Sequence, residues 1–523
     1  MSHIEPEHSP PASFRILDLF AGPGGLDVAA HVLGYEVTGI EWDAGACATR
    51  TAAGMDTFQG DVRHYRAAFF PLAEVLTGGP PCQTFTVAGH GAGRRALDQV
   101  VEYIEQLHNV VRSETPDWMK IFRTWRRISE ELRRKEIEAK EVRADKCKIE
   151  EARASNRKAI KSRLKELGQS PNQIKTFLKE LKTPQYPEIP NNDDELKGIL
   201  KEFWDLTDGL EILKSKLEEL GDERTGLVLQ PLWWIIERSK RPGLKPYEAV
   251  ILEQVPAVMP VWKEYAKVLA SLGYRTRRQL MHTEEFGVPQ TRRRAVLMAR
   301  LAPTARSNEM PTGTLLEVPE THKRYRPGFH PSVRPKALHP DTLFGETSDS
   351  APKAPPREQW MSMELALNKA RRISSGKVHK RPAFTVISNY GTGGDPEARG
   401  RRDHNVPSAT ITGKVSRNRL VHQGTDNDLE EFDRFTHAEA GVLQTFPVKY
   451  PWSGNDVPQQ IGNAVPPLLA LHVLQHVLEP GVSDSKAKSR LKQVAERLES
   501  WKPAAPVRPR MHAGLKGHPL TDR

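Results

Sequence analysis

The sequence has only three cysteines in 523 residues: Cys47, Cys82 and Cys147. They form no CxxC pair and no Cys/His spacing typical of zinc sites, so we expect no metal and no disulfide framework. The first residues, MSHIEPEHSPPAS, lack the charged-then-apolar pattern of a signal peptide, and no run of 18 apolar residues occurs. We therefore expect a soluble cytoplasmic protein with no membrane partner.

The chain carries more positive than negative charge, with 77 Lys and Arg against 66 Asp and Glu and a formal net charge of +11. Clustered cations release counterions from phosphate backbones, so this excess favours an anionic partner. The length corresponds to roughly two to four structural units of about 100–200 residues.

Short apolar strand candidates alternate with helical patterns from Phe14 onward. This alternation predicts an α/β fold with a parallel sheet covered by helices. The expected strands are residues 14–20, 35–43, 74–79, 248–255 and 293–300, and the clearest helices are 26–34 and 466–478.

Changes in composition divide the chain into seven expected segments. Between Arg95 and Gly221, Lys, Arg, Glu and Leu dominate and strand signals are absent, which predicts a helical insertion. The segments are 1–13, a flexible N-terminus; 14–94, 222–302 and 431–480, three parts of a catalytic domain; 95–221, the insertion; 303–430, a recognition domain; and 481–523, a basic, flexible C-terminal tail.

Three glycines, Gly22, Gly24 and Gly25, follow the first expected strand and precede a helix. Such a turn lets a ligand approach bare backbone, although a structural tight turn accounts for the pattern equally well. The spacing departs from the nicotinamide pattern G-x-G-x-x-G because position 27 is Asp, which argues against a dehydrogenase. Glu41, at the end of the next strand, is placed to accept hydrogen bonds from ribose hydroxyls.

Cys82 lies in PPCQTFTVAG, directly after an expected strand. A lone cysteine is usually a small buried apolar residue, but flanking Pro and Gly argue against core packing here. At the carboxyl end of a strand in an open α/β sheet, near basic groups, a thiolate is a candidate nucleophile.

These segments resemble the DNA cytosine-5 methyltransferase family, and they occur in that family's order. The matching motifs are FAGPGG, EWD, GD, PPCQ, ILEQV, QTRRR, THAEAGVLQTFP and QIGNAVPP. The resemblance covers about half the chain. It implies a Rossmann-like S-adenosylmethionine-dependent methyltransferase sheet with a smaller target-recognition domain.

The resemblance also implies the catalytic residues. Cys82 would attack carbon 6 of a cytosine flipped out of the duplex, which makes carbon 5 nucleophilic enough to accept a methyl group. Glu253 would hold N3 and the exocyclic amine. Arg294 would contact the cytosine O2, and Arg292 would support the cysteine loop or the acid.

For the cofactor, S-adenosylmethionine, the resemblance implies stacking on Phe20 and Trp42 and a bond from the adenine amine to Asp61, which on sequence grounds alone is more simply a solvated loop acid. The full set of expected cofactor residues is Phe20, Gly22, Gly24, Gly25, Glu41, Trp42, Asp61, Val62, Pro81, Leu227, Asn463 and Val465.

The sequence departs from the family pattern at two places. Glu253-Gln254-Val255 has Gln254 where the family usually has the asparagine of Glu-Asn-Val, and Ala438 replaces a usual arginine. Two other readings stay open: a catalytically silent DNA-binding relative, and an RNA cytosine-5 methyltransferase. Retention of Cys82, Glu253 and Arg294 argues against the first, and the long segment 303–430 argues against the second.

That segment is expected to read DNA bases, because Arg to guanine and Asn or Gln to adenine are the commonest contacts. The candidates are Arg399, Arg401, Arg402, His404, Lys414, Arg417, Asn418 and Arg419, any of which could instead contact phosphate. Thr410-Ile411 resembles the family's Thr-aliphatic pair. The expected partners are double-stranded DNA and a cognate restriction endonuclease, with a monomer acting on DNA in the nucleoid.

The insertion shows a leucine-rich seam of spacings three and four from Leu196 to Leu220, and a patchier one from Ile121 to Ile149. Such seams predict an antiparallel helical coiled-coil hairpin, with a new helix starting at Ser170-Pro171. Its role is either a solvated spacer or an arm that contacts flanking DNA or a partner protein.

Overall fold

The computed structural model describes residues 13–81, 92–113, 117–181, 187–220, 225–302, 315–327, 357–388, 400–480 and 484–511. The chain divides into two compact units. The first contains residues 1–81, 108–118 and 229–523, and the second contains 82–107 and 119–228.

The first unit is built on a seven-stranded Rossmann-like sheet of order β3-β2-β1-β4-β5-β7-β6. Its first five strands pair in parallel, and β7 runs antiparallel between β5 and β6. The strands are β1 (Arg15–Leu19), β2 (Glu36–Glu41), β3 (Asp56–Gln59), β4 (Val75–Gly78), β5 (Ala249–Gln254), β6 (Tyr274–His282) and β7 (Arg293–Leu301). The predicted α/β class is therefore confirmed, but β3 and β6 were not predicted as strands.

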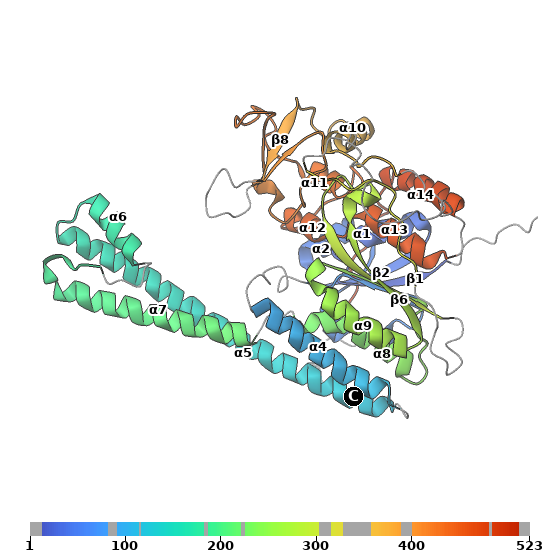
Figure 1. Cartoon of the computed structure of the whole chain (residues 1–523), viewed down its shortest axis with the longest axis horizontal. Helices are drawn as coiled ribbons and strands as arrows, with labels where there is room; N and C mark the ends of the chain where they lie inside the picture. The colour runs from blue at the N-terminus through green and yellow to red at the C-terminus, as the bar shows by residue number, and fades with distance from the viewer. Residues whose placement is uncertain are drawn as a thin grey trace, which may run out of the picture. The chain divides into compact units, whose positions relative to one another are not determined.

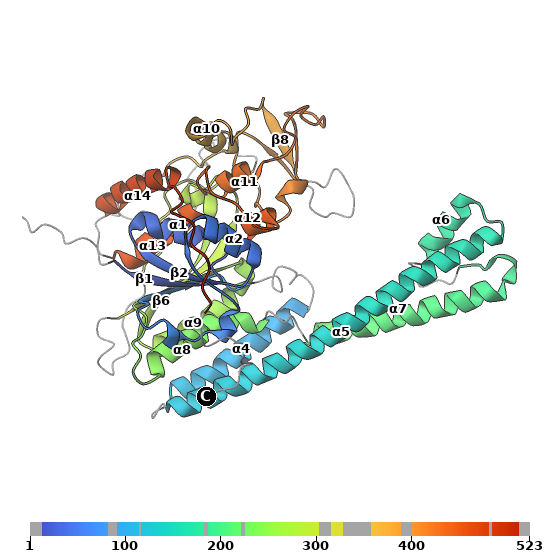
Figure 2. The same ribbon diagram turned by 180° about the vertical axis from the view of Figure 1, so that it is seen from behind.

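Helices cover both faces of this sheet, as a sheet buried on two sides requires. One face holds α1 (Gly25–Leu33), α2 (Ala44–Ala52), α13 (Pro467–Leu478) and α14 (Asp484–Glu499), and the other holds α8 (Gln230–Lys240) and α9 (Met259–Ser271) (Figures 1 and 2). Apolar side chains of α1, α13 and α14 form the main core against β1 and β5. One described stretch, Val457–Leu478, has the length and hydropathy of a membrane span, but 78% of it is buried within the fold, as core helices are.

A three-stranded antiparallel sheet of order β10-β8-β9 forms the centre of the recognition segment. It comprises β8 (Phe384–Ile387), β9 (Arg401–Asp403) and β10 (Arg419–His422), and it packs with α10 (Met363–Ile373), α11 (His437–Leu443) and α12 (Val457–Asn463). Gln290, just before β7, bridges to Ser408 and joins this region to the large sheet.

The expectation of a flexible C-terminal tail is wrong for the described part, residues 484–511. Asp484–Glu499 forms α14, whose Val494 and Leu498 are buried in the main core. Beyond it, the Arg510 backbone pairs with β3, donating to Thr57 O at 2.8 Å and accepting from Gln59 N at 3.0 Å. Apolar residues at helical spacing in this basic segment pack α14 against the core.

The second unit is helical. Its elements are α5 (Trp118–Glu166), α6 (Pro171–Glu180), α7 (Asp194–Leu220) and most of α4 (Ala92–Val111). The first residue of α5, Trp118, is assigned to the first unit. Ser170 caps α6 with a capping box, so the predicted helix start is confirmed.

Helices α5 and α7 run antiparallel along each other (Figures 1 and 2). Glu138 pairs with Lys216 at 3.0 Å, and Arg163, farther along α5, pairs with Asp193 at 2.8 Å. The end of α5, α6 and the start of α7 share a small apolar core that includes Ile160, Phe177 and Leu200, so this end of the unit is packed by its own side chains.

Candidate active site

The glycine-rich turn after β1 follows a path that ordinary side chains resist. Gly22 and Gly24 have φ of +54° and +97°, and Phe20 also has a positive φ of +61°. A Cβ added to Gly25 would lie 2.1 Å from the Val465 carbonyl oxygen, whereas one on Gly22 would meet no atom of the described residues within 4 Å. The turn therefore packs tightly on Val465 and leaves space in front of Gly22 that no described residue fills.

Glu41, at the end of β2, lies against this turn. Its carboxylate accepts hydrogen bonds from the backbone N–H groups of Gly22 and Asp43, each at 2.7 Å. Burial raises the pKa of Glu41, while these two hydrogen bonds and Arg50 oppose the shift. The neighbouring Trp42 indole is 68% exposed. The acid and the aromatic face thus lie beside the open space at Gly22.

Asp61 is engaged within the protein. It caps a short helical turn, accepting from Arg63 N at 2.9 Å, and its carboxylate also pairs with the Arg63 guanidinium at 2.5 Å. Burial opposes ionisation, but the bonds from Arg63 outweigh it and lower the pKa of Asp61. A ligand amine at this position would share the carboxylate with Arg63. Val62, next to it, is buried.

The other expected cofactor residues are spread over three segments. Pro81 is the last described residue before the 82–91 gap, so Cys82 lies outside the described residues. Asn463 is exposed at the end of α12 and accepts from Gln459 Nε2 at 2.9 Å. Leu227 lies in a 3-10 helix, Thr225–Leu229, and belongs to the second unit.

The carboxylate predicted to act on the base, Glu253, lies near the carboxyl end of β5. β4 and β5 pair in parallel with Gly78 opposite Leu252, so Glu253 comes beside Gly79. A Cβ on Gly79 would be 3.6 Å from Glu253 Oε2. Arg294 Nε lies 2.5 Å from Glu253 Oε1, and both side chains are mostly buried. Two residues far apart in sequence therefore form one ion pair beside the loop that leads to Cys82.

Gln254, one of the two departures from the family pattern, supports the segment that leads to Cys82. Its buried side-chain amide donates to the Pro80 carbonyl, and its Oε1 accepts from Val255 N at 2.5 Å. The longer side chain therefore still links the end of β5 to the segment just before Cys82.

Arg292 is held by backbone carbonyl groups of two distant segments. Its guanidinium is buried and donates to the backbone carbonyls of Ile411 and Gly462, both at 3.0 Å. Burial, and then the nearby Arg294, lower the pKa of Arg292. The residue thus ties the recognition segment and α12 to the sheet, and its predicted support of the cysteine loop or the acid stays a prediction.

Gln290 takes part in the same network, and the sequence analysis gave it no role. Its Oε1 accepts from Ile411 N at 2.7 Å, and its Nε2 donates to Gln444 Oε1 at 3.0 Å. Both glutamines are fully buried. Their presence in two separate family motifs was the available signal, but only the fold shows that they meet.

A buried ion pair underlies the glycine turn. Arg50, in α2, binds the Asp27 carboxylate through both guanidinium Nη atoms at 2.6 and 2.9 Å, and both side chains are fully buried. Asp18 lies nearby on β1 and accepts from Thr77 Oγ1 at 2.7 Å. Burial, and then Asp27, raise the pKa of Asp18 to about 7. No sequence pattern pointed to this cluster.

The structure sorts the predicted base-reading residues. Arg401, Arg419 and His404 contact the carboxylates of Asp426, Asp428 and Glu364, respectively. Arg402 lies over the Tyr325 ring. Lys414 and Arg417 are exposed, Asn418 is buried, and Arg399 lies outside the described residues.

Comparison with known proteins supports the same reading of the motifs. The model of the C-5 cytosine-specific DNA methylase family matches residues 14–119 and 216–479. The chain belongs to this family. The methylase match leaves 120–215 uncovered, which includes most of α5 and all of α6.

Curated relatives resemble this chain only over short regions. The type II methyltransferase M.HpaII of Haemophilus parainfluenzae is 38% identical over 97 residues, 18% of this chain and 27% of that protein. M.NgoPII of Neisseria gonorrhoeae is 34% identical over 90 residues, 16% of this chain and 26% of that protein. The matches thus span about a quarter of these relatives.

Among solved structures, the S. pombe Dnmt2 methyltransferase is 13% identical, with a TM-score of 0.41 over 89% of this chain and 99% of that one. A putative DNA modification methyltransferase of an E. coli prophage is 16% identical, with a TM-score of 0.36 over 89% and 99%.

Proposed function

We propose that this methylase is a DNA (cytosine-5)-methyltransferase that acts on a cytosine flipped out of duplex DNA. The observation that carries the proposal is the Glu253–Arg294 pair, 2.5 Å apart, beside Gly79 and the loop that leads into Cys82. A carboxyl group and a guanidinium offered together match the N3, amine and O2 edge of cytosine.

Cytosine needs this arrangement because its carbon 5 is a poor nucleophile. The Cys82 thiolate forms a bond to carbon 6, and the electron pair of the 5,6 double bond becomes available at carbon 5. Glu253 holds the proton at N3 that balances the charge, and Arg294 donates to O2. After carbon 5 takes the methyl group, water accepts the carbon 5 proton, the 5,6 double bond forms again as the Cys82 thiolate leaves carbon 6, and the N3 proton returns to Glu253.

The family depends on S-adenosylmethionine, and the turn around Gly22 has the features to hold it. The open space at Gly22, the Glu41 carboxylate and the exposed Trp42 indole offer room, a ribose acceptor and an aromatic face. When bound, S-adenosylmethionine supplies the electrophilic methyl group. Phe20, Val62, Pro81, Asn463 and Val465 complete the proposed set in the first unit, and Leu227, in the second unit, stays an expectation from the sequence.

The direct test is bisulfite sequencing of DNA from cells that express the protein, which reports activity and target motif together. Cys82→Ser should abolish methylation and leave S-adenosylmethionine affinity nearly unchanged, because the proposed contacts of Gly22, Glu41 and Trp42 do not use the thiol. Duplexes with 5-fluorocytosine should trap the wild-type protein covalently, since the fluorine cannot be eliminated. Methylation by the serine variant at the wild-type rate would refute the mechanism.

We further propose that α5 and α7 form a coiled-coil arm that contacts DNA flanking the target. The support is the antiparallel pairing and the charge of α5, which has 17 Lys and Arg residues against 9 Asp and Glu. The buried seam positions include Val142 on α5 and Leu196, Phe203 and Leu210 on α7.

The names of the matched relatives, type II methyltransferases, support a role in restriction and modification with a cognate endonuclease. DNA from expressing cells should then resist one restriction endonuclease of the same specificity. Protein in the bacterial cytoplasm, associated with the nucleoid, accords with that role.

A further inference from the structure

A pocket in the recognition region has hydrogen-bonding groups that the described protein does not satisfy. It has a volume of about 240 Å³ and lies between β8, the start of β9 and the segment 408–412. Ser408 and Asn418 are 3% and 7% exposed, yet Ser408 Oγ and Asn418 Oδ1 have no hydrogen-bond partner among the described residues. Leaving such buried polar atoms unpaired costs about 1–3 kcal/mol each, so a bound group is favoured there.

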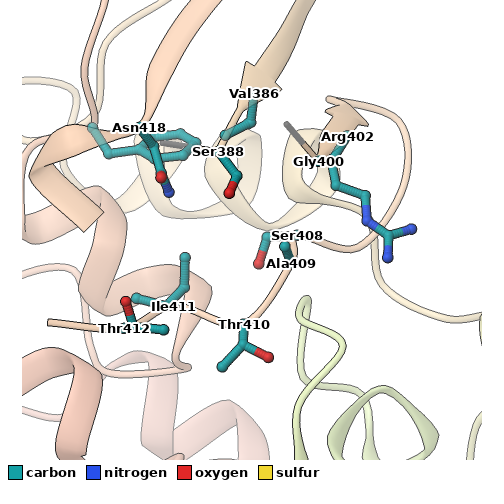
Figure 3. A pocket seen from close by; sticks show the side chains of 11 residues that line it. Val386, Ser388, Gly400, Arg402, Ser408, Ala409, Thr410, Ile411, Thr412 and Asn418 are labelled. Atoms are coloured by element: carbon teal, nitrogen blue, oxygen red, sulfur yellow. The ribbon is translucent and has the colours of Figure 1, made fainter. Parts of the chain in front are cut away.

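The backbone holds both side chains in place. Ser408 N donates to Pro289 O at 3.0 Å, and Thr291 N donates to Ser408 O at 2.8 Å, which fixes this segment to the QTRRR motif. Asn418 N donates to Val415 O at 3.1 Å, immediately before β10 begins. The Asn418 side chain points toward the space above Ile411, and Ser408 borders the same space (Figure 3).

The lining suits the hydrogen-bonding edge of a nucleobase. Val386, Ile411 and Phe435 supply apolar surface, and Arg402 is the charged member of the lining. None of the described lining residues carries a carboxylate, so these residues do not repel a ligand near the phosphates of DNA. A base that stays paired in the duplex presents such an edge in the major groove.

We propose that this pocket reads one base of the recognition sequence, and that the base carries an exocyclic amine, adenine or cytosine. This inference rests on the proposed function. Asn418 Oδ1 accepts a hydrogen bond, and in the major groove only adenine N6 and cytosine N4 donate one. Adenine would also engage Ser408, whose hydroxyl can donate to N7; cytosine would use Asn418 alone.

The experiment compares wild type, Asn418→Ala and Ser408→Ala by selecting bound duplexes from a randomised pool and by bisulfite sequencing of methylated DNA. Ser416→Ala, at an exposed neighbouring position, is the matched control. In Asn418→Ala, preference for adenine or cytosine at one position should fall about 5- to 150-fold, as expected for one lost base contact. Ser408→Ala should weaken it further only if the base is adenine.

A second measurement uses duplexes in which that base lacks its exocyclic amine. Wild type should lose affinity for them, whereas Asn418→Ala should bind them as well as it binds the natural duplex. An unchanged motif in Asn418→Ala, or equal losses at every sequence, would overturn the assignment. Sequence-selective binding without methylation in wild type would refute the proposed function and leave the pocket's role intact, so the two failures are distinct.

Discussion

Replacing Gly25 by alanine tests whether the turn after β1 and the segment around Val465 form one cofactor site. The new Cβ would lie 2.1 Å from the Val465 carbonyl oxygen and 3.2 Å from the Phe446 ring. Contacts below about 3 Å are not tolerated, and the obstacle is backbone, so the turn or the Val465 segment must move. Overpacking of this kind costs about 1–3 kcal/mol.

If that strain is relieved by displacing residues that bind S-adenosylmethionine, affinity should fall by about 5- to 150-fold. The assay is calorimetric titration of S-adenosylmethionine, with thermal unfolding measured on the same samples. Gly34→Ala is the matched control, because Gly34 ends the same helix at φ +90° and an added Cβ would have no described atom within 4 Å. It should lose about 1–2 kcal/mol of stability from the left-handed backbone and bind the cofactor normally.

Wild-type affinity together with wild-type stability in Gly25→Ala would show that the contact with Val465 is absent in solution. Lost stability with unchanged affinity would show that the contact is real but lies outside the cofactor site.

Three further predictions concern charge. The folded-state pKa of Asp18 is about 7, above the ordinary 3.8, so between these pH values the folded protein binds more protons than the unfolded one and its stability should fall as pH rises from about 4 to about 7. In Asp18→Asn, the free energy of unfolding measured in urea should depend less on pH over that window. An equal pH dependence in both proteins would show that Asp18 does not cause it. Arg294→Met removes the cation 2.5 Å from Glu253 and should lower kcat about 10²- to 10³-fold in single-turnover assays with cofactor affinity kept; retained kcat would remove Arg294 from the site. Replacing residues 139–215 by a short turn joins Glu138 to Lys216, whose side chains are 3.0 Å apart. The shortened protein should keep cofactor binding, and its affinity for long duplexes should depend less on salt. An unchanged salt dependence would favour the interpretation of the insertion as a solvated spacer.

The sequence alone identified the family, because its motifs are local. Each is a few adjacent residues whose order along the chain can be read directly, as in FAGPGG or QTRRR. Helix signals were equally local: Ser170-Pro171 predicted the start of α6, and the leucine seam predicted the buried positions Leu196, Phe203 and Leu210. The sheet class followed from alternation of strands and helices.

Strands with mixed composition were harder. β3 is only Asp56–Gln59 and contains polar residues at both ends, so its local pattern is weak. Its place at the sheet edge depends on pairing with β2 and on the Arg510 backbone, which lies more than 450 residues away in the chain. For the same reason the segment after α14 was mistaken for a flexible tail.

The roles within QTRRR were decided by the tertiary structure. Sequence places Gln290, Arg292 and Arg294 at alternate positions but does not say what each one meets. The fold brings Ile411 and Gly462 to Arg292, Gln444 to Gln290, and Glu253 to Arg294. Sequence therefore determined which side chains are present, whereas long-range packing decided which of them are buried as braces and which one meets the carboxylate.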